Sequence, residues 1–235
     1  MRYFITLSYN GTALSGWQVQ PNAQTVQAIL EDALSKLLRE SITLTGAGRT
    51  DAGVSAIGYT AHFDAAGAFD ADALGYKLNA ILPPEIVVHS INAVEDEMHA
   101  RFDARRREYT YFLHRCKDPF MNTFSWQCGY DLDFEAMNSA AAALLGTHDF
   151  SCFEKTGGNA KTSFCTIYEA AWHPYTPTHL SLMGFSPGME QRPAASTPAT
   201  SILGPRKGLG LRLSNAGAEL SLRCANPPPK FIRER

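Results

Sequence analysis

The chain has 235 residues, 45% of them hydrophobic, which is enough for a packed core in one large domain or two small ones. Its formal net charge of −2 excludes a uniformly basic polyanion binder, so binding to a polyanion would depend on a local cluster of charge. Five cysteines without a C-x-x-C pair exclude a dense extracellular disulfide scaffold and favour a reducing compartment. We find no signal-peptide pattern and no apolar run of about 18 residues, so we expect a cytoplasmic protein without a membrane span.

The first 104 residues alternate between strand and helix patterns. Strand segments are rich in β-branched and aromatic residues, and helical segments repeat apolar residues with 3,4 spacing. The expected strands are 2–9, 42–45, 54–64 and 86–94, and the expected helices are 25–39, capped by Thr25, and a second one from near Asp70 to Pro83-Pro84. This order predicts a ferredoxin-like half on an antiparallel sheet.

A second, partial α/β half begins at residue 105. It has an expected strand at 105–114, a helix at 134–145 that Gly146 can terminate, and a strand at 163–172. The fold prediction is therefore α+β, with two ferredoxin-like halves over 1–104 and 105–173. We expect them to form one mixed, mostly antiparallel sheet with a central cleft.

Residues 174–235 form an atypical tail. They hold nine of the chain's 13 prolines and carry eight basic residues against three acidic ones. We find no sustained helical or strand period in them, and stretches such as QRPAASTPATS are typical of disorder. Two explanations stay open: a disordered extension, or a segment that does not belong to the fold begun before it.

The loop GAGRTDAGVSA (46–56) holds the most informative residues. Neither G-x-G-x-x-G nor G-x-x-x-x-G-K-[ST] fits, because Asp51 occupies the third glycine position and no Gly-Lys-Ser/Thr occurs. Arg49 and Asp51 are two apart, so in an extended segment both point to the same side. A neighbouring guanidinium favours an ionised carboxylate, which suits nucleophilic or base chemistry. The residues alone leave open a plain ion pair that orders the loop.

The motif G-x-G-R-T-D-x-G-V in this loop strongly resembles the catalytic motif of the TruA-type tRNA pseudouridine synthases. Four further segments match the same family in the right order. They are Y-N-G-T…G-W-Q-x-Q (9–20), L-N-A-I-L-P-P-E-I (78–86), R-R-E-Y-T-Y (106–111) and H-D-F-S-C-F (148–153). The resemblance covers about residues 1–173, and five ordered matches are far more specific than any one of them.

The resemblance implies the pseudouridine synthase fold and an isomerase that converts uridine to pseudouridine without metal or other cofactor. Asp51 falls on the family's catalytic aspartate, Tyr109 on its active-site tyrosine, and Arg49 on the arginine that pairs with the aspartate. The carboxylate could attack uracil C6, attack C1′, or act as a base. The implied substrate is tRNA, at uridines 38, 39 and 40 of the anticodon stem-loop, and the implied assembly is a homodimer.

A basic and aromatic cluster supports the RNA partner. Alternation along 105–111 puts Arg105, Arg107 and Tyr109 on one face, and Arg101 precedes them. Such a mixture suits phosphate contact and base stacking. A solvated charged strand is the alternative.

Three other interpretations have less support in the sequence. The separations of His148, Cys152, Cys165 and His173 match no compact metal pattern. A glycoside hydrolase normally has a second catalytic carboxylate, and no second acidic motif stands out. A non-catalytic RNA-binding module or inactive relative stays open because of the tail.

The resemblance ends where the family continues with a segment containing F-L-R-N-M-V-R. Here the sequence reads THLSLMGFSPGMEQRPAAS instead, so the family's leucine near the uracil has no counterpart that we can assign. We hypothesise that residues from about 178 onward arise from a frameshift. Translation of the other two DNA frames tests this, and the absence of such a segment from both would refute it.

Overall fold

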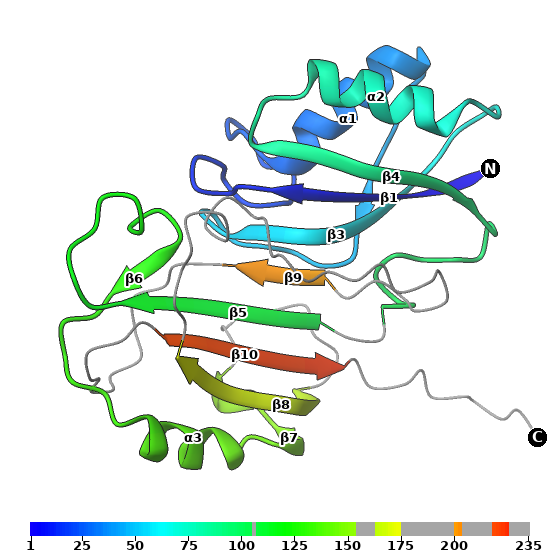
Figure 1. Ribbon diagram of the computed structural model, residues 1–235. Helices are drawn as coiled ribbons and strands as arrows, with labels where there is room; N and C mark the ends of the chain where they lie inside the picture. Colours follow the sequence, from blue (N-terminus) through cyan, green and yellow to red (C-terminus); the bar gives the residue numbers. More distant parts are fainter. Residues whose placement is uncertain (105–106, 154–162, 175–199, 204–217, 226–235) are drawn as a thin grey trace, which may run out of the picture.

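The computed structural model describes residues 1–104, 107–153, 163–174, 200–203 and 218–225 (Figure 1). Its elements in chain order are β1 (Arg2–Tyr9), α1 (Val26–Leu38), β2 (Thr45–Gly46), β3 (Ser55–Asp64), α2 (Ala71–Ile81), β4 (Ile86–Val94), β5 (Arg107–His114), β6 (Ser125–Gln127), α3 (Phe134–Ala142), β7 (Gly146–Asp149), a 3-10 turn (Ser151–Phe153), β8 (Phe164–Pro174), β9 (Thr200–Leu203) and β10 (Ala218–Ala225).

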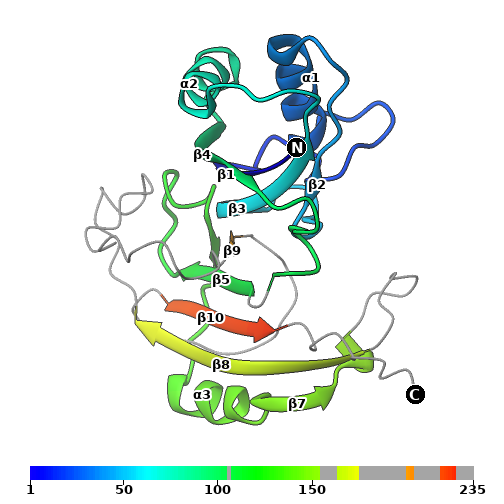
Figure 2. The same cartoon turned by 90° about the vertical axis from the view of Figure 1, so that its right-hand side faces the viewer.

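One sheet runs through the described part of the chain. Its order is β4-β1-β3-β9-β5-β10-β8-β7, with β2 added beside β3 and β6 beside β5. Neighbouring strands pair antiparallel, except that β5 runs parallel to β9 and to β6. The prediction of one mixed, mostly antiparallel sheet is confirmed. Figure 2 shows α1 and α2 near β4, β1 and β3, while α3 lies beside β8 at the other end.

Local sequence signals set the helix starts. Thr25 has extended backbone angles, and its hydroxyl accepts a hydrogen bond from the backbone N–H of Ala28. Asp70 caps α2 in the same way through the N–H of Ala73. These caps satisfy donors that have no partner inside the helix. They confirm both predicted starts, and α2 ends just before Pro83 as predicted.

Several sequence expectations need correction. Residues 42–44 are not a strand, and β2 consists of Thr45 and Gly46 alone. The third helix ends at Ala142, because the N–H groups of residues 143–145 bond three residues back, in tighter turns that close the helix early. The short strands β6 and β7 were not predicted. The expected strand at 105–114 begins, in the described residues, at Arg107; Arg105 and Arg106 lie outside them.

The tail contributes two strands, which corrects the expectation of no strand pattern there. In β10, the sequence AELSLRCA alternates small or apolar residues with polar ones. This is the period of a half-buried strand, and the surrounding prolines obscured it. β10 pairs with β5 on one side and β8 on the other, and β9 pairs with β3 and β5. The other residues of the predicted disordered or frameshifted segment lie outside the described residues.

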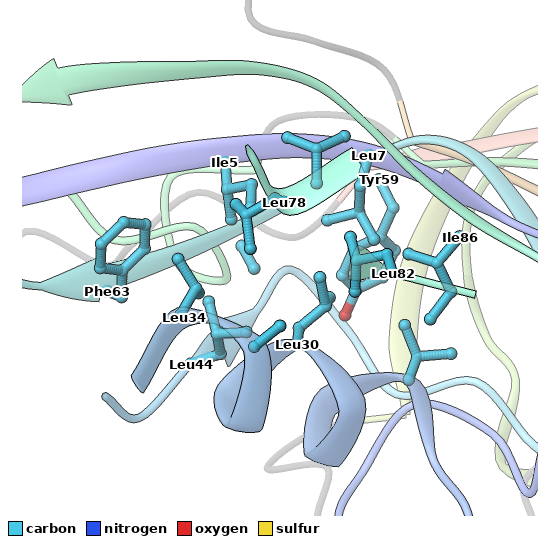
Figure 3. Close-up of a cluster of buried hydrophobic side chains, with 14 of the residues drawn as sticks. Ile5, Leu7, Leu30, Leu34, Leu44, Tyr59, Phe63, Leu78, Leu82 and Ile86 are labelled. Carbon is cyan, nitrogen blue, oxygen red and sulfur yellow. The ribbon is translucent and has the colours of Figure 1, made fainter. Parts of the chain in front are cut away.

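The main hydrophobic core lies between α1, α2 and the strands β1, β3 and β4. Ile5, Leu7, Leu30 and Leu78 are completely buried in it, as Figure 3 shows. Each such side chain contributes about 1.5–3 kcal/mol by leaving water. A second, smaller cluster lies under α3 and contains Leu113, Cys128, Leu132 and Met137. The larger core makes the β1–β3–β4 region the firm support on which the site is built.

In the part of the chain that the structure describes, no helix combines the length and apolar character needed to span a membrane.

Candidate active site

The loop between β2 and β3 presents Arg49 and Asp51 outward on either side of the buried Thr50. The backbone carbonyl of Asp51 accepts a hydrogen bond from the N–H of Val54 at 3.2 Å, so residues 51–54 form a tight turn. The third residue of this turn, Gly53, has a φ of +80°, a conformation that favours glycine. The sequence R-T-D-x-G therefore folds into a turn with Asp51 as its first residue.

Thr50 fixes this loop from below. Its hydroxyl forms a buried hydrogen bond of 2.9 Å with the hydroxyl of Tyr9, and its carbonyl accepts from the backbone N–H of Trp17 at 3.2 Å. The N–H of Gly53 donates to the carbonyl of Leu14 at 3.1 Å. The backbone on both sides of Asp51 is thus tied to the segment between β1 and α1.

Glycines make this close approach possible. A Cβ at Gly16 would lie 2.4 Å from the carbonyl oxygen of Thr50, and one at Gly11 would lie 2.0 Å from that of Val54. Gly16 also has a φ of +87°. The family signature Y-N-G-T…G-W-Q therefore has a physical role: it forms the surface on which the loop of Asp51 rests.

Tyr59 supports the start of the loop. Its hydroxyl donates a hydrogen bond to the carbonyl of Gly48, and its ring packs against Trp17 with centroids 4.2 Å apart. Burial raises the pKa of Tyr59 far above its usual range, and burial raises that of Tyr9 to about 12 against the lowering effect of Thr50. Both hydroxyls therefore stay protonated at neutral pH and act as fixed supports. Arg49 and Asp51, by contrast, are exposed at the surface of the loop.

Strand β5 reaches this loop through Arg107. Its Nη2 donates to the carbonyl of Ala47 at 2.7 Å, and the half-buried Tyr109 follows two residues later on the same strand. Alternation along β5 directs both side chains to the same face. The structure thereby brings the strand of Tyr109 beside the loop of Asp51. The sequence assigned Arg107 to RNA, and its contact with the loop adds a second role that the sequence did not predict.

Arg101 lies in the segment between β4 and β5. Its positive charge and that of Arg107 act to lower the pKa of Tyr59, in opposition to burial. The Arg101 side chain is exposed. Arg105, which the sequence places in the same basic cluster, lies outside the described residues.

Sequence reasoning missed Tyr59, because a tyrosine inside a strand carries no local signal of a contact 11 residues away. Tyr9, Gly16 and Trp17 were within reach, since they belong to a quoted family segment, but the sequence assigned them no function.

The described residues contain no group of three or more His, Cys, Asp or Glu side chains arranged to hold a metal ion. His148 is bonded locally, since its Nε2 donates to the carbonyl of Leu145 at 2.7 Å.

Comparison with known proteins identifies the family. Residues 5–103 and 140–192 match the tRNA pseudouridine synthase family, so the match extends beyond residue 173, where the quoted motifs end. The chain is 46% identical over 179 residues to tRNA pseudouridine synthase A of Porphyromonas gingivalis, with 75% of this chain and 71% of the relative covered. It is 44% identical to the protein of that name from Bacteroides thetaiotaomicron, with 73% and 64% covered, and 42% identical to that from Bacillus licheniformis, with 73% and 71% covered. This chain belongs to the tRNA pseudouridine synthase family, a family of isomerases.

Proposed function

We propose that this chain isomerises uridine to pseudouridine in the anticodon stem-loop of tRNA, at positions 38, 39 and 40. The observation that carries the proposal is the fixed loop with Asp51 exposed at the first position of its turn, in a chain of this family. Relatives 41–46% identical are named tRNA pseudouridine synthase A. Preorganised loops of this kind hold a reacting group in place without reordering during the reaction.

In this proposal Asp51 is the catalytic carboxylate. Arg49, which is also exposed two residues earlier, pairs with it and holds the extruded nucleotide. Tyr109 stacks on the uracil, and the half-buried position of its ring on β5 is compatible with one face meeting a base. The reaction breaks the bond between C1′ and N1, turns the base, and joins C1′ to C5, so no outside oxidant or cofactor is needed.

The RNA backbone runs over Arg101, Arg105 and Arg107. Cations placed beside a reaction loop bind phosphates and set the register of the RNA. The halves 1–104 and 105–173 are ferredoxin-like units, and the cleft between them holds the substrate. The protein works in the cytoplasm as a homodimer. The mixed sheet and the contact between Arg107 and the loop support the meeting of these two halves at the site.

Tritium release from C5-labelled unmodified tRNA tests the proposal. The change is Asp51→Asn, which keeps the shape of the side chain and removes its charge. We expect release by the parent and a loss of at least about a thousandfold in the variant, because the reacting group itself is removed. The matched control is Asp72→Asn, a carboxylate exposed on α2.

Each outcome has one meaning. Release that is lost in Asp51→Asn and kept in Asp72→Asn supports the synthase. tRNA that is bound but never converted by the parent would indicate a non-catalytic relative. Sequencing of pseudouridine positions in the product tests the choice of residues 38–40.

A further inference from the structure

An aromatic side chain stands exposed beside the proposed site. Phe102, in the turn between β4 and β5, is 72% exposed. One side of its ring lies on the imidazole of His99, with centroids 4.2 Å apart and planes tilted by 34°. Its neighbour Arg101 is also exposed. Single exposed aromatic residues are common, so Phe102 is informative only through its setting.

That setting is a rigid turn. The backbone N–H of Ala100 donates a buried hydrogen bond of 3.1 Å to Nδ1 of His62, a residue of β3. The ring of His99 lies against that of His62, with centroids 4.6 Å apart. The N–H groups of Arg101 and Phe102 donate to Nδ1 of His99 at 3.1 and 3.3 Å. Phe102 is therefore held by successive ring contacts through His99 to His62, which is anchored in the sheet.

The charges around the turn also have fixed partners. The guanidinium of Arg2 donates to the carbonyl of Met98 at 3.1 Å. The carboxylate of Asp103 accepts the N–H of His99 at 2.6 Å. His62, which holds the turn through Ala100, is opposite Thr45 of β2 in the sheet, and the loop that carries Asp51 begins directly after β2. The exposed ring of Phe102 and the exposed Arg101 therefore lie on a turn that is fixed beside the start of this loop.

We propose that Phe102 is a stacking platform for a base of the RNA next to the target uridine, while Arg101 binds the adjoining phosphate. The inference rests on the proposed function and adds a subsite to it. An exposed ring that is already ordered loses little entropy when a base stacks on it. Stacking accepts any base, because each has a π face, so the platform contributes affinity and register rather than sequence choice.

Binding is measured in an Asp51→Asn background, so that the reaction does not change the RNA. Phe102→Ala in this background should weaken the affinity for unmodified tRNA by about 5- to 100-fold, the range for one stacked base. Phe102→Leu keeps apolar bulk but no ring and should show a similar loss. Phe102→Trp should bind like the parent, and its indole fluorescence should be quenched by tRNA. The matched control is Tyr76→Ala, which removes a ring 80% exposed on α2.

Thermal unfolding of each variant separates binding from folding. Loss of affinity in Phe102→Ala and Phe102→Leu at unchanged melting temperature, with quenching in Phe102→Trp, supports the platform. Equal affinity of Phe102→Ala and its parent, or an unquenched tryptophan, overturns it even if the enzyme converts uridine. Quenching by tRNA, when the parent that retains Asp51 converts no uridine, supports the platform and rejects the proposed catalysis instead.

Discussion

At the scale of single residues, backbone conformation decides where the side chains of the candidate site point. Arg49 and Asp51 face outward because Thr50 between them is buried and hydrogen-bonded to Tyr9. The turn that follows needs a residue with positive φ at Gly53. The outward position of the pair and the glycine at 53 therefore belong to the same loop conformation.

We predict that Gly53→Ala lowers stability by about 1–2 kcal/mol, because an L side chain is strained at this φ of +80°. A Cβ there would meet no atom within 4 Å, so the effect comes from the backbone and not from a clash. Chemical denaturation measures the stability, and tritium release should fall with it as Asp51 shifts. Gly67→Ala, where space is equally open and no positive φ applies, is the control. Equal stability of the two variants would contradict the prediction.

The environment of His62 predicts that the stability of the protein depends on pH. Burial, with help from the charge of His99, lowers the pKa of His62 from 6.5 to about 4. In the unfolded chain this histidine is protonated below about pH 6.5, whereas in the folded protein it stays neutral until about pH 4. Stability should therefore be fully present above pH 6.5 and should fall as the pH drops through this window.

The melting temperature measured from pH 7 to pH 4.5 checks this expectation. His62→Asn, whose amide oxygen can accept the N–H of Ala100, should flatten the curve. His173→Asn, at an exposed position, should not. Parallel curves for the parent and His62→Asn would refute the role of this histidine.

At the scale of elements, contacts between segments far apart in sequence join the two sides of the site. The segment after β1 supports the loop before β3, and Arg107 of β5 reaches Ala47 at the start of the same loop. Strand and helix positions near β1, α1, α2 and β4 followed from periodicity and caps. The contact between Arg107 and Ala47 did not follow from the sequence, because alternation predicts which face of a strand a side chain is on but not which residue it contacts.

Arg107→Gln should lower kcat for tritium release about tenfold or more, because the loop of Asp51 loses a support and small misplacements are costly. If Arg107 only bound a phosphate, the change would instead appear in the affinity for tRNA and in its dependence on salt. Single-turnover rates at saturating tRNA, together with binding at two salt concentrations, separate the two roles. Arg115→Gln, in an ion pair with Asp131 after β5, is the control.

At the scale of the whole molecule, one sheet carries two cores of unequal size. The larger lies over β1, β3 and β4, and the smaller lies under α3. β9 lies between β3 and β5 and pairs with both, so this short strand from the tail joins the two regions. The tail is thereby part of the sheet in residues 200–203 and 218–225.

Ile202→Pro should destabilise the protein by about 3 kcal/mol and abolish activity. Ile202 is opposite Ala56 on one side and Tyr109 on the other, and proline removes the N–H from a strand that is paired on both edges. Thermal unfolding and tritium release measure the two effects. Ile202→Val retains the backbone donor and should behave like the parent. A proline variant of parental stability and activity would show that β9 is dispensable.

The sequence by itself determined β1, β3, β4, α1 and α2 of the N-terminal region, the caps at Thr25 and Asp70, and the candidate residues Asp51, Arg49 and Tyr109. These follow from local periodicity, from capping chemistry and from ordered motifs. Only the tertiary structure decided that the Tyr9–Trp17 segment supports the loop, that Tyr59 holds Gly48, and that β9 and β10 enter the sheet. The physical reason is that the spacing of apolar residues along a segment is a local property of the chain. Which residue lies on the other side of a contact depends instead on how segments far apart in the sequence pack together.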